Sequence, residues 1–318
     1  MSGQVALRPC GTRPVERVRA VLAALAMVAA AAASGCGGAP PSGPIRAVGV
    51  ESQYADVISQ IGGSFVSVVA ILRKPDTDPH AFQASPAVAR ELESANLVVE
   101  NGLGYDAWVD KVLAATPGDR RSVIDAQHVM RLPGSTANPH LWYAPETMPV
   151  VAQAIANVLA TLEPGEAAYF HANVRKFDAS LGPWKTALAA ISGRFKGTPV
   201  AVTEPVADYL LDAAGLRIAT PRALELAIMN GTDPAPQDIA VENALLSGRA
   251  VKALVYNRQV TNSLTQAFLA RARTAGIPVI GVYETMPEGD RYQSWMLATT
   301  RALSDALSRG ASTRSQDK

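Results

Sequence analysis

Residues 163–195 read EPGEAAYFHANVRKFDASLGPWKTALAAISGRF, and the rest of the chain divides around this stretch. Its large apolar residues recur at helical spacing on one stripe, at Tyr169, Val174, Phe177, Leu181, Trp184, Leu188 and Ile191. Pro183 lies inside the pattern and predicts a kink or a break there, because proline cannot continue the helical hydrogen bonding. We therefore expect one long, rigid linking helix over residues 163–196.

Strand-like and helix-like runs alternate on both sides of this helix. Before it, over 45–162, strands are expected at 47–50, 65–72, 97–99 and 122–124, and helices at 54–61, 86–94, 105–115 and 148–162. After it, over 197–310, strands are expected at 200–202, 253–256 and 279–283, and helices at 207–214, 236–246, 263–275 and 292–307. The alternation predicts an α/β fold with two (βα)-rich lobes and mostly parallel sheets.

Composition limits the classes of protein to which the chain can belong. The 318 residues are 48% hydrophobic and 18% charged, enough to build the cores of two lobes. The formal net charge of +1 argues against a nucleic-acid-binding protein, which needs an excess of basic surface. Two cysteines cannot form a disulfide framework or a cysteine-rich zinc site.

The N-terminus has the pattern of a secreted, lipid-anchored protein. Four arginines precede an apolar run over 21–33, which is too short for a permanent membrane helix, and Cys36 follows two small residues. We expect a lipoprotein signal peptide over 1–35 and lipidation of Cys36; the alternative is an ordinary secretory signal. Removal of the signal, with its four arginines and one glutamate, leaves 283 residues of net charge −2. Residues 36–44 are rich in Gly and Pro and predict a flexible tether, and 311–318 predict a disordered tail.

Four side chains of metal-ligand type lie near the ends of predicted strands. His80 and His140 each follow a proline, and Glu204 and Glu284 each come directly after a buried strand. Loops at the carboxyl ends of parallel strands face a common crevice, and a carboxylate held close to a core needs a partner or a metal. Each residue alone is explained as an ordinary loop residue. The four together, two in each lobe, favour a metal site between the lobes.

At these residues the chain resembles a known family. The segments TDPHAF (77–82), NGLGYDAW (101–108) and NPHLW (138–142) are similar to the motifs of zinc/manganese-type solute-binding proteins of metal ABC transporters, the cluster A-I family. The resemblance covers about residues 45–309. It implies two lobes joined by a single helix, with the metal in the interlobe cleft held by His80, His140, Glu204 and Glu284. Glu284 departs from the aspartate usual in the family, and Asn138 replaces an aspartate, one of the residues that orient the imidazole.

The resemblance also implies what the protein does. It would capture Zn²⁺ or Mn²⁺ as cargo outside the cytoplasmic membrane and deliver it to an ABC permease with its ATPase. It would be a monomer, anchored to the bacterial membrane through Cys36, and would be neither an enzyme nor a nucleic-acid-binding protein. The choice of metal stays open, because two imidazoles and two carboxylates suit tetrahedral Zn²⁺, and bidentate carboxylates suit Mn²⁺. A histidine-rich loop, common in zinc-specific members, is missing, which leans towards manganese.

Two other functions fit the sequence less well than metal capture. A metallohydrolase needs an open metal position for water, and the sequence contains no H-E-x-x-H, G-x-S-x-G or P-loop motif. An adhesin-type surface lipoprotein is supported by nothing beyond the expected surface placement. Two further histidines, His128 and His171, are expected at the surface or the edge of the core.

Overall fold

The computed structural model describes residues 43–74, 82–116, 118 and 121–313, and residues 43–318 form one compact unit. The predicted signal peptide over 1–35, Cys36 and His80 lie outside the described residues. Within the described ranges no helix combines the length and the apolar composition that a membrane span requires.

The first lobe contains a fully parallel sheet of four strands in the order β2-β1-β3-β4. Val48 of the inner strand β1 pairs with Val69 on one side and Val98 on the other. Helices α2 and α6 cover one face of the sheet, and α3 and α4 cover the other. The elements are β1 (Ile45–Glu51), α2 (Ser52–Gly62), β2 (Val66–Leu72), α3 (Pro86–Ser94), β3 (Leu97–Glu100), α4 (Trp108–Ala115), β4 (Ser122–Asp125), α5 (Ala126–Val129) and α6 (Thr147–Leu162).

The second lobe repeats this plan with a parallel sheet in the order β6-β5-β7-β8. Val255 of β7 pairs with Val202 of β5 and with Ile280 of β8, so β7 lies between those two strands. The elements are β5 (Pro199–Val202), α9 (Asp208–Ala213), β6 (Arg217–Ile218), α10 (Arg222–Met229), α11 (Pro236–Ser247), β7 (Leu254–Asn257), α12 (Ser263–Thr274), β8 (Val279–Val282) and α13 (Tyr292–Arg309).

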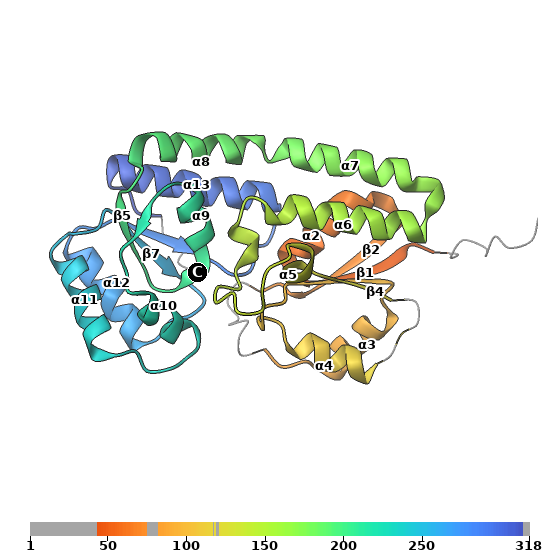
Figure 1. Cartoon of the computed structure of the whole chain (residues 1–318), viewed down its shortest axis with the longest axis horizontal. Coiled ribbons are helices and arrows are strands. Elements are labelled where there is room, and N and C mark those ends of the chain that lie inside the picture. The colour runs from red at the N-terminus through yellow and green to blue at the C-terminus, as the bar shows by residue number, and fades with distance from the viewer. Residues whose placement is uncertain (1–42, 75–81, 117, 119–120, 314–318) are drawn as a thin grey trace, which may run out of the picture. The chain divides into compact units, whose positions relative to one another are not determined.

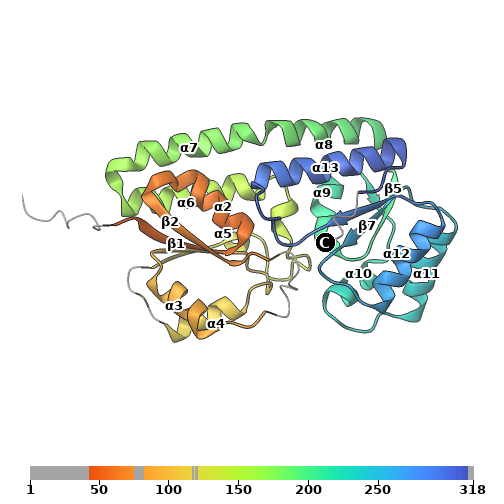
Figure 2. The same cartoon turned by 180° about the vertical axis from the view of Figure 1, so that it is seen from behind.

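The expected linking helix is present and bends in its middle. It consists of α7 (Ala167–Ser180) and α8 (Gly182–Phe195), which run end to end (Figure 1). The break falls at Leu181, and Pro183 lies in the first turn of α8, where a missing N–H costs no hydrogen bond. Helix α13 packs against α8 and also contacts α2, so a second helix runs along the linking one (Figure 2).

One hydrophobic core extends through both lobes. The same cluster of buried side chains contains Val57 of α2, Phe177 of α7, Trp184 of α8, Val255 of β7 and Trp295 of α13. The rings of Trp184 and Tyr292 meet edge to face at 5.8 Å between centroids. Because close-packed cores resist deformation, this shared core restrains movement of the two sheets relative to each other.

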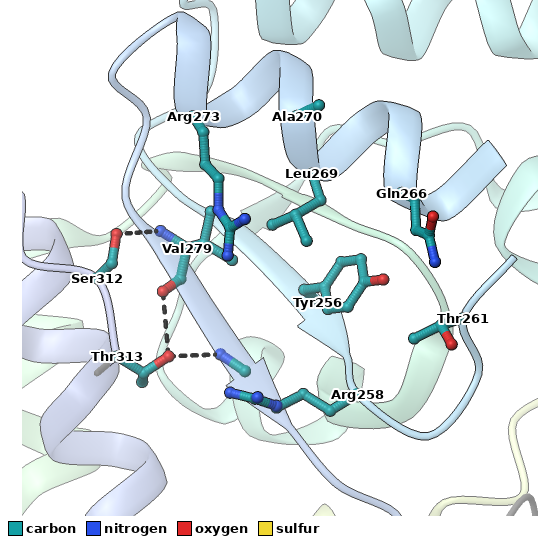
Figure 3. A pocket seen from close by; sticks show the side chains of 11 residues that line it. Tyr256, Arg258, Thr261, Gln266, Leu269, Ala270, Arg273, Val279, Ser312 and Thr313 are labelled. Carbon is teal, nitrogen blue, oxygen red and sulfur yellow. Dashed lines mark hydrogen bonds between the residues drawn. The ribbon is translucent and has the colours of Figure 1, made fainter. Parts of the chain in front are cut away.

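Several predicted boundaries differ from the structure. Helix α4 begins at Trp108 rather than near residue 105, because residues 101–107 form an irregular loop. The short strand β6 and helix α10 had no clear periodicity and were not predicted. The expected disordered tail begins with an ordered pair, because Thr313 donates its N–H to the Val279 carbonyl at 2.9 Å. Val279 donates its N–H to Ser312 Oγ at 3.0 Å (Figure 3). Residues 314–318 lie outside the described residues.

Candidate metal centre

Both glutamates follow strands of the second sheet, as the sequence predicts. Glu204 comes two residues after β5 and Glu284 two residues after β8, with 2% and 0% of their surfaces exposed. Because β7 lies between β5 and β8, its last residue, Asn257, lies between the two carboxylates. The Asn257 Nδ2 atom donates to Glu284 Oε1 at 2.7 Å and to Glu204 Oε1 at 3.4 Å. The structure therefore brings both predicted carboxylates to one amide group.

A glutamine fixes the segment that carries Glu284. Gln259, two residues beyond Asn257, accepts the backbone N–H groups of Glu284 at 2.6 Å and Thr285 at 2.9 Å with its Oε1 atom. From the first lobe, Gln53 donates to the Glu284 carbonyl at 3.3 Å. The backbone at Glu284 is thus held from both lobes.

His140 is brought to the same place from the first lobe. It is fully buried, and its Nε2 atom lies 3.4 Å from Glu284 Oε2. Its Nδ1 atom lies 2.8 Å from Asn138 Oδ1, and Asn138 Nδ2 donates to the Pro205 carbonyl at 2.8 Å. Because the Asn138 amide donates through Nδ2, Oδ1 is the acceptor, which assigns the imidazole proton to Nδ1. Nε2 is then the ring nitrogen directed towards Glu284, the arrangement of a histidine whose second nitrogen is held by a hydrogen bond while the first faces a metal site.

A tyrosine from the loop over residues 101–108 (NGLGYDAW) contacts the carboxylate of Glu284. Tyr105 donates its hydroxyl to Glu284 Oε2 at 3.0 Å, and its ring meets the His140 ring edge to face at 5.8 Å between centroids. Burial raises the pKa of Tyr105 well above its ordinary value, and the negative charge of Glu284 raises it further. The phenol therefore stays protonated and acts as a donor.

This loop is shaped by Asp106 and by unusual backbone angles. Residues 102–104 have φ values of 77°, 56° and 79°, a left-handed run that two glycines make possible around Leu103. The Asp106 carboxylate accepts the backbone N–H groups of Asn101 at 2.6 Å and Gly102 at 2.9 Å. These bonds oppose the burial that raises the pKa of Asp106 to about 6. Asn101 in turn donates to the Pro139 carbonyl at 2.8 Å, which anchors the residue before His140.

The candidate centre is incomplete in the described part of the chain. His140, Glu204 and Glu284 are brought together, but no group of three or more His, Cys, Asp or Glu side chains among the described residues has the geometry to hold a metal. The fourth predicted ligand, His80, lies outside those residues; beyond it, Phe82 packs on Trp108 at 4.8 Å between ring centroids. His128 is exposed and His171 is half-buried, as expected.

Sequence reasoning missed three residues of the centre. Asn257 and Gln259 follow a predicted strand, but an amide at a strand end has no spacing that distinguishes a ligand-holding role from a turn. Tyr105 lies in a motif used for the resemblance, without an assigned role. Only the pairing of β7 between β5 and β8 reveals what Asn257 contacts.

The cavity drawn in Figure 3 is separate from this centre. It has a volume of about 460 Å³ and lies against β7, β8 and α12. Two arginines, Arg258 and Arg273, line it together with Tyr256. The three predicted ligands in the described part of the chain, His140, Glu204 and Glu284, are not among its lining residues. It therefore adds nothing to the candidate metal centre.

Comparison with known proteins identifies the family. A family model described as zinc-uptake complex component A, periplasmic, matches residues 50–306. The chain belongs to this family. The resemblance seen in the three motifs is thus confirmed, and because the family consists of extracytoplasmic solute-binding proteins, the enzyme alternative is set aside.

The chain matches only part of the length of each curated relative described next. The manganese-binding lipoprotein MntA of Bacillus subtilis (strain 168) is 27% identical over 146 residues, covering 43% of this chain and 46% of MntA. The iron-binding protein YfeA of Yersinia pestis is 26% identical over 128 residues, covering 38% of this chain and 40% of YfeA. The chain thus matches about half or less of the length of these relatives.

Solved structures confirm the fold. FpvC of Pseudomonas aeruginosa, in complex with Mn²⁺, has a TM-score of 0.69 at 20% identity, covering 84% of this chain and 100% of that chain. The periplasmic zinc-binding protein TroA of Treponema pallidum has a TM-score of 0.69 at 16% identity, covering 83% of this chain and 98% of that chain. Two parallel-sheet lobes with a long bent helix are therefore the fold of this chain and of these proteins.

Proposed function

We propose that this protein captures a divalent transition-metal ion outside the cytoplasmic membrane and delivers it to an ABC permease. The observation that carries the proposal is the approach of His140 Nε2 to Glu284 Oε2 at 3.4 Å, with Glu204 joined to Glu284 through Asn257. Imidazole nitrogen from one lobe and carboxylate oxygen from the other suit Zn²⁺ and Mn²⁺. Membership of the family supports the same function, as do its manganese-binding relative MntA and its iron-binding relative YfeA.

The ligands we assign are His80, His140, Glu204 and Glu284. The first lobe supplies both imidazoles and the second both carboxylates, so the cargo joins the lobes. Four protein ligands leave no place for a reactive water on a tetrahedral ion, which fits transport rather than hydrolysis. Buried hydrogen bonds around His140 and Glu284 orient their side chains before the cargo arrives.

Release of the cargo follows from the same structure. The linking helix and the shared core resist a wide opening of the two lobes. We infer that docking on the permease moves the ligand-bearing loops or tilts the lobes slightly. We also assign Cys36 as the lipid anchor at the membrane and the monomer as the working form, with the permease and its ATPase as partners. The lobes extend over 45–162 and 197–310 in this assignment.

Metal binding is tested on the purified chain without its signal peptide. An ion that binds only the folded state stabilises that state by about 4 kcal/mol when the free ion concentration is about a thousand times its Kd. Added Zn²⁺ or Mn²⁺ should therefore raise the melting temperature of this protein. His140→Ala should abolish this rise. His171→Ala, a half-buried histidine on α7, is the matched control and should leave it unchanged. Absence of any metal-dependent rise in the unaltered protein would sink the proposal.

A further inference from the structure

The cavity of Figure 3 lies between the second sheet and one face of helix α12. This face lines the cavity with four residues at helical spacing: Gln266, Leu269, Ala270 and Arg273. Tyr256 of β7 points to the same helix, because it belongs to the buried cluster that contains Phe268 of α12. The cavity thus has one wall from the helix and one from the strands.

A glycine makes room for the arginine on the strand side. Gly281 of β8 pairs with Tyr256 of β7, and a Cβ atom on this glycine would lie 2.7 Å from Arg258 Cδ. The aliphatic part of Arg258 therefore crosses β8 at a position without a side chain. Its guanidinium carbon lies 5.8 Å from the centre of the Tyr283 ring, and the residue is half-buried. Glycine and aromatic ring together hold Arg258 in a defined position.

The last described residues close one end of the cavity. Ser312 Oγ accepts the N–H of Val279, and Thr313 Oγ1 accepts the N–H of Gly281, each at 3.0 Å. Both hydroxyl residues line the cavity. They bind the backbone of β8, a strand at the edge of its sheet, and so fix the outline of the cavity on that side.

The charge of the cavity is positive and is not balanced by the chain. Its described lining includes Arg258 and Arg273 but no Asp or Glu. Among the described residues neither arginine has a salt bridge or a side-chain hydrogen bond, whereas Arg222 pairs with Asp208 and Glu225 at 2.7 Å. Two like charges that share a cavity repel each other, so an anion that binds there lowers the free energy of both.

We propose that this cavity binds a small organic dianion, a dicarboxylate or a phosphate monoester, whose two charges match the two arginines. Guanidinium groups present paired N–H donors that fit the oxygens of a carboxylate or a phosphate. Leu269, Val279 and the Tyr256 ring add apolar surface for a carbon skeleton. The volume of about 460 Å³ lies in the range of small-molecule sites, about 300–1,000 Å³. The site goes beyond the proposed function and uses none of the assigned metal ligands.

The test is isothermal titration of the full mature chain with succinate and with glycerol 3-phosphate, at about 0.15 M salt to screen unspecific attraction. Binding of at least one of these dianions is expected. Arg258→Gln and Arg273→Gln should each weaken that binding about tenfold or more, the effect of losing a hydrogen bond between charged groups. Arg273 is exposed, so its substitution leaves the fold intact, and an unchanged melting temperature checks this.

Arg271→Gln is the matched control. Arg271 is an exposed residue of α12, two positions before Arg273; it donates to Ser247 Oγ at 3.3 Å, and neither of that pair lines the cavity. The substitution removes the same charge from the same helix and should leave the affinity for the dianion unchanged. An equal loss in Arg271→Gln and Arg273→Gln would overturn the inference, because overall charge would then explain the binding.

Three further results would overturn the inference. The first is that the unaltered protein binds neither dianion, and the second is that inorganic phosphate binds as tightly as glycerol 3-phosphate. The third is binding to phosphatidylglycerol vesicles without binding of either soluble dianion, because the ligand would then be a membrane surface. Each of these results leaves the metal-binding test of the proposed function untouched.

Discussion

The Nδ1 atom of His140 lies 2.8 Å from the Oδ1 atom of Asn138. This contact fixes the ring and directs its other nitrogen towards Glu284. The same amide donates to the carbonyl of Pro205, next to Glu204, so one side chain orients the imidazole and holds the backbone beside a carboxylate of the other lobe. Asn138 therefore couples the positions of two assigned ligands.

Replacing Asn138 by alanine should weaken metal binding by about 10–100-fold, because partners that orient a ligating histidine contribute that much to affinity. Asn138→Asp keeps the acceptor for Nδ1 and should bind metal better than the alanine variant. Competition titrations of both variants give the comparison. Equal affinity in the alanine variant and the unaltered protein would contradict an orienting role.

The Tyr105 hydroxyl contributes one hydrogen bond to Glu284 and can be removed with little change in packing. Tyr105→Phe keeps the ring against His140 and Trp142 but removes the donor to Glu284 Oε2. We expect metal affinity to fall about 5–10-fold, the effect of one hydrogen bond to a charged group. Isothermal titration measures the change.

Tyr292→Phe is the control for this variant. Its hydroxyl donates to the Trp142 carbonyl at 2.7 Å, so the change removes an equally buried phenol hydrogen bond away from the carboxylates. The unfolding free energy should fall by about 1 kcal/mol while the metal affinity stays the same. A larger loss of metal affinity in Tyr292→Phe than in Tyr105→Phe would show that the loss of a buried phenol hydrogen bond lowers the affinity without any contact to Glu284.

The sequence predicts those parts of the fold that have strong local patterns. The apolar runs at 97–99 and 279–282 are strands in the structure, because parallel strands covered on both faces must be continuously apolar. The predicted strand 279–283 extends one residue beyond the end of β8. Ser85 caps α3 and Pro86 begins it, as their residue types predict. The strand β6, only Arg217–Ile218, is too short to carry any period and is formed by its pairing with β5.

The candidate centre is predictable only in part for a related reason. Glu204 and Glu284 stand out because acids directly after buried strands are costly without partners. Asn257 does not stand out, since an asparagine after a strand is ordinary turn chemistry. Its contacts with both glutamates depend on β7 lying between β5 and β8. This strand order is set by long-range pairing and cannot be predicted from the residues next to Asn257.

Metal loading should change the size of the protein very little. The lobes are already joined in the described structure: Tyr143 donates to the Tyr283 carbonyl at 2.7 Å, and Gln293 donates to Gln60 at 2.6 Å. Together with the shared core, these bonds oppose a hinge motion. Small-angle scattering of metal-free and metal-loaded protein should give the same radius of gyration. A clear compaction on loading would contradict the loop-movement mechanism of release.

A buried acid that is not part of the candidate metal centre makes the free energy of unfolding depend on pH. Glu242 on α11 is fully buried; this burial, with the negative charge of Glu225 adding to it, raises its pKa to about 7. The folded state therefore binds this proton more tightly than the unfolded state, whose pKa is about 4.5. Below about pH 4.5 the Glu242 carboxyl does not lower the free energy of unfolding, and this free energy falls as the pH rises from there to about 7.

Glu242→Gln should leave stability near pH 4.5 almost unchanged and raise the unfolding free energy at pH 8 by about 1–3 kcal/mol. Denaturant unfolding at the two pH values measures this, with the exposed Glu93→Gln on α3 as the control that should show no such difference. Equal effects of the two substitutions at pH 8 would mean that Glu242 is charged in the folded protein at no cost.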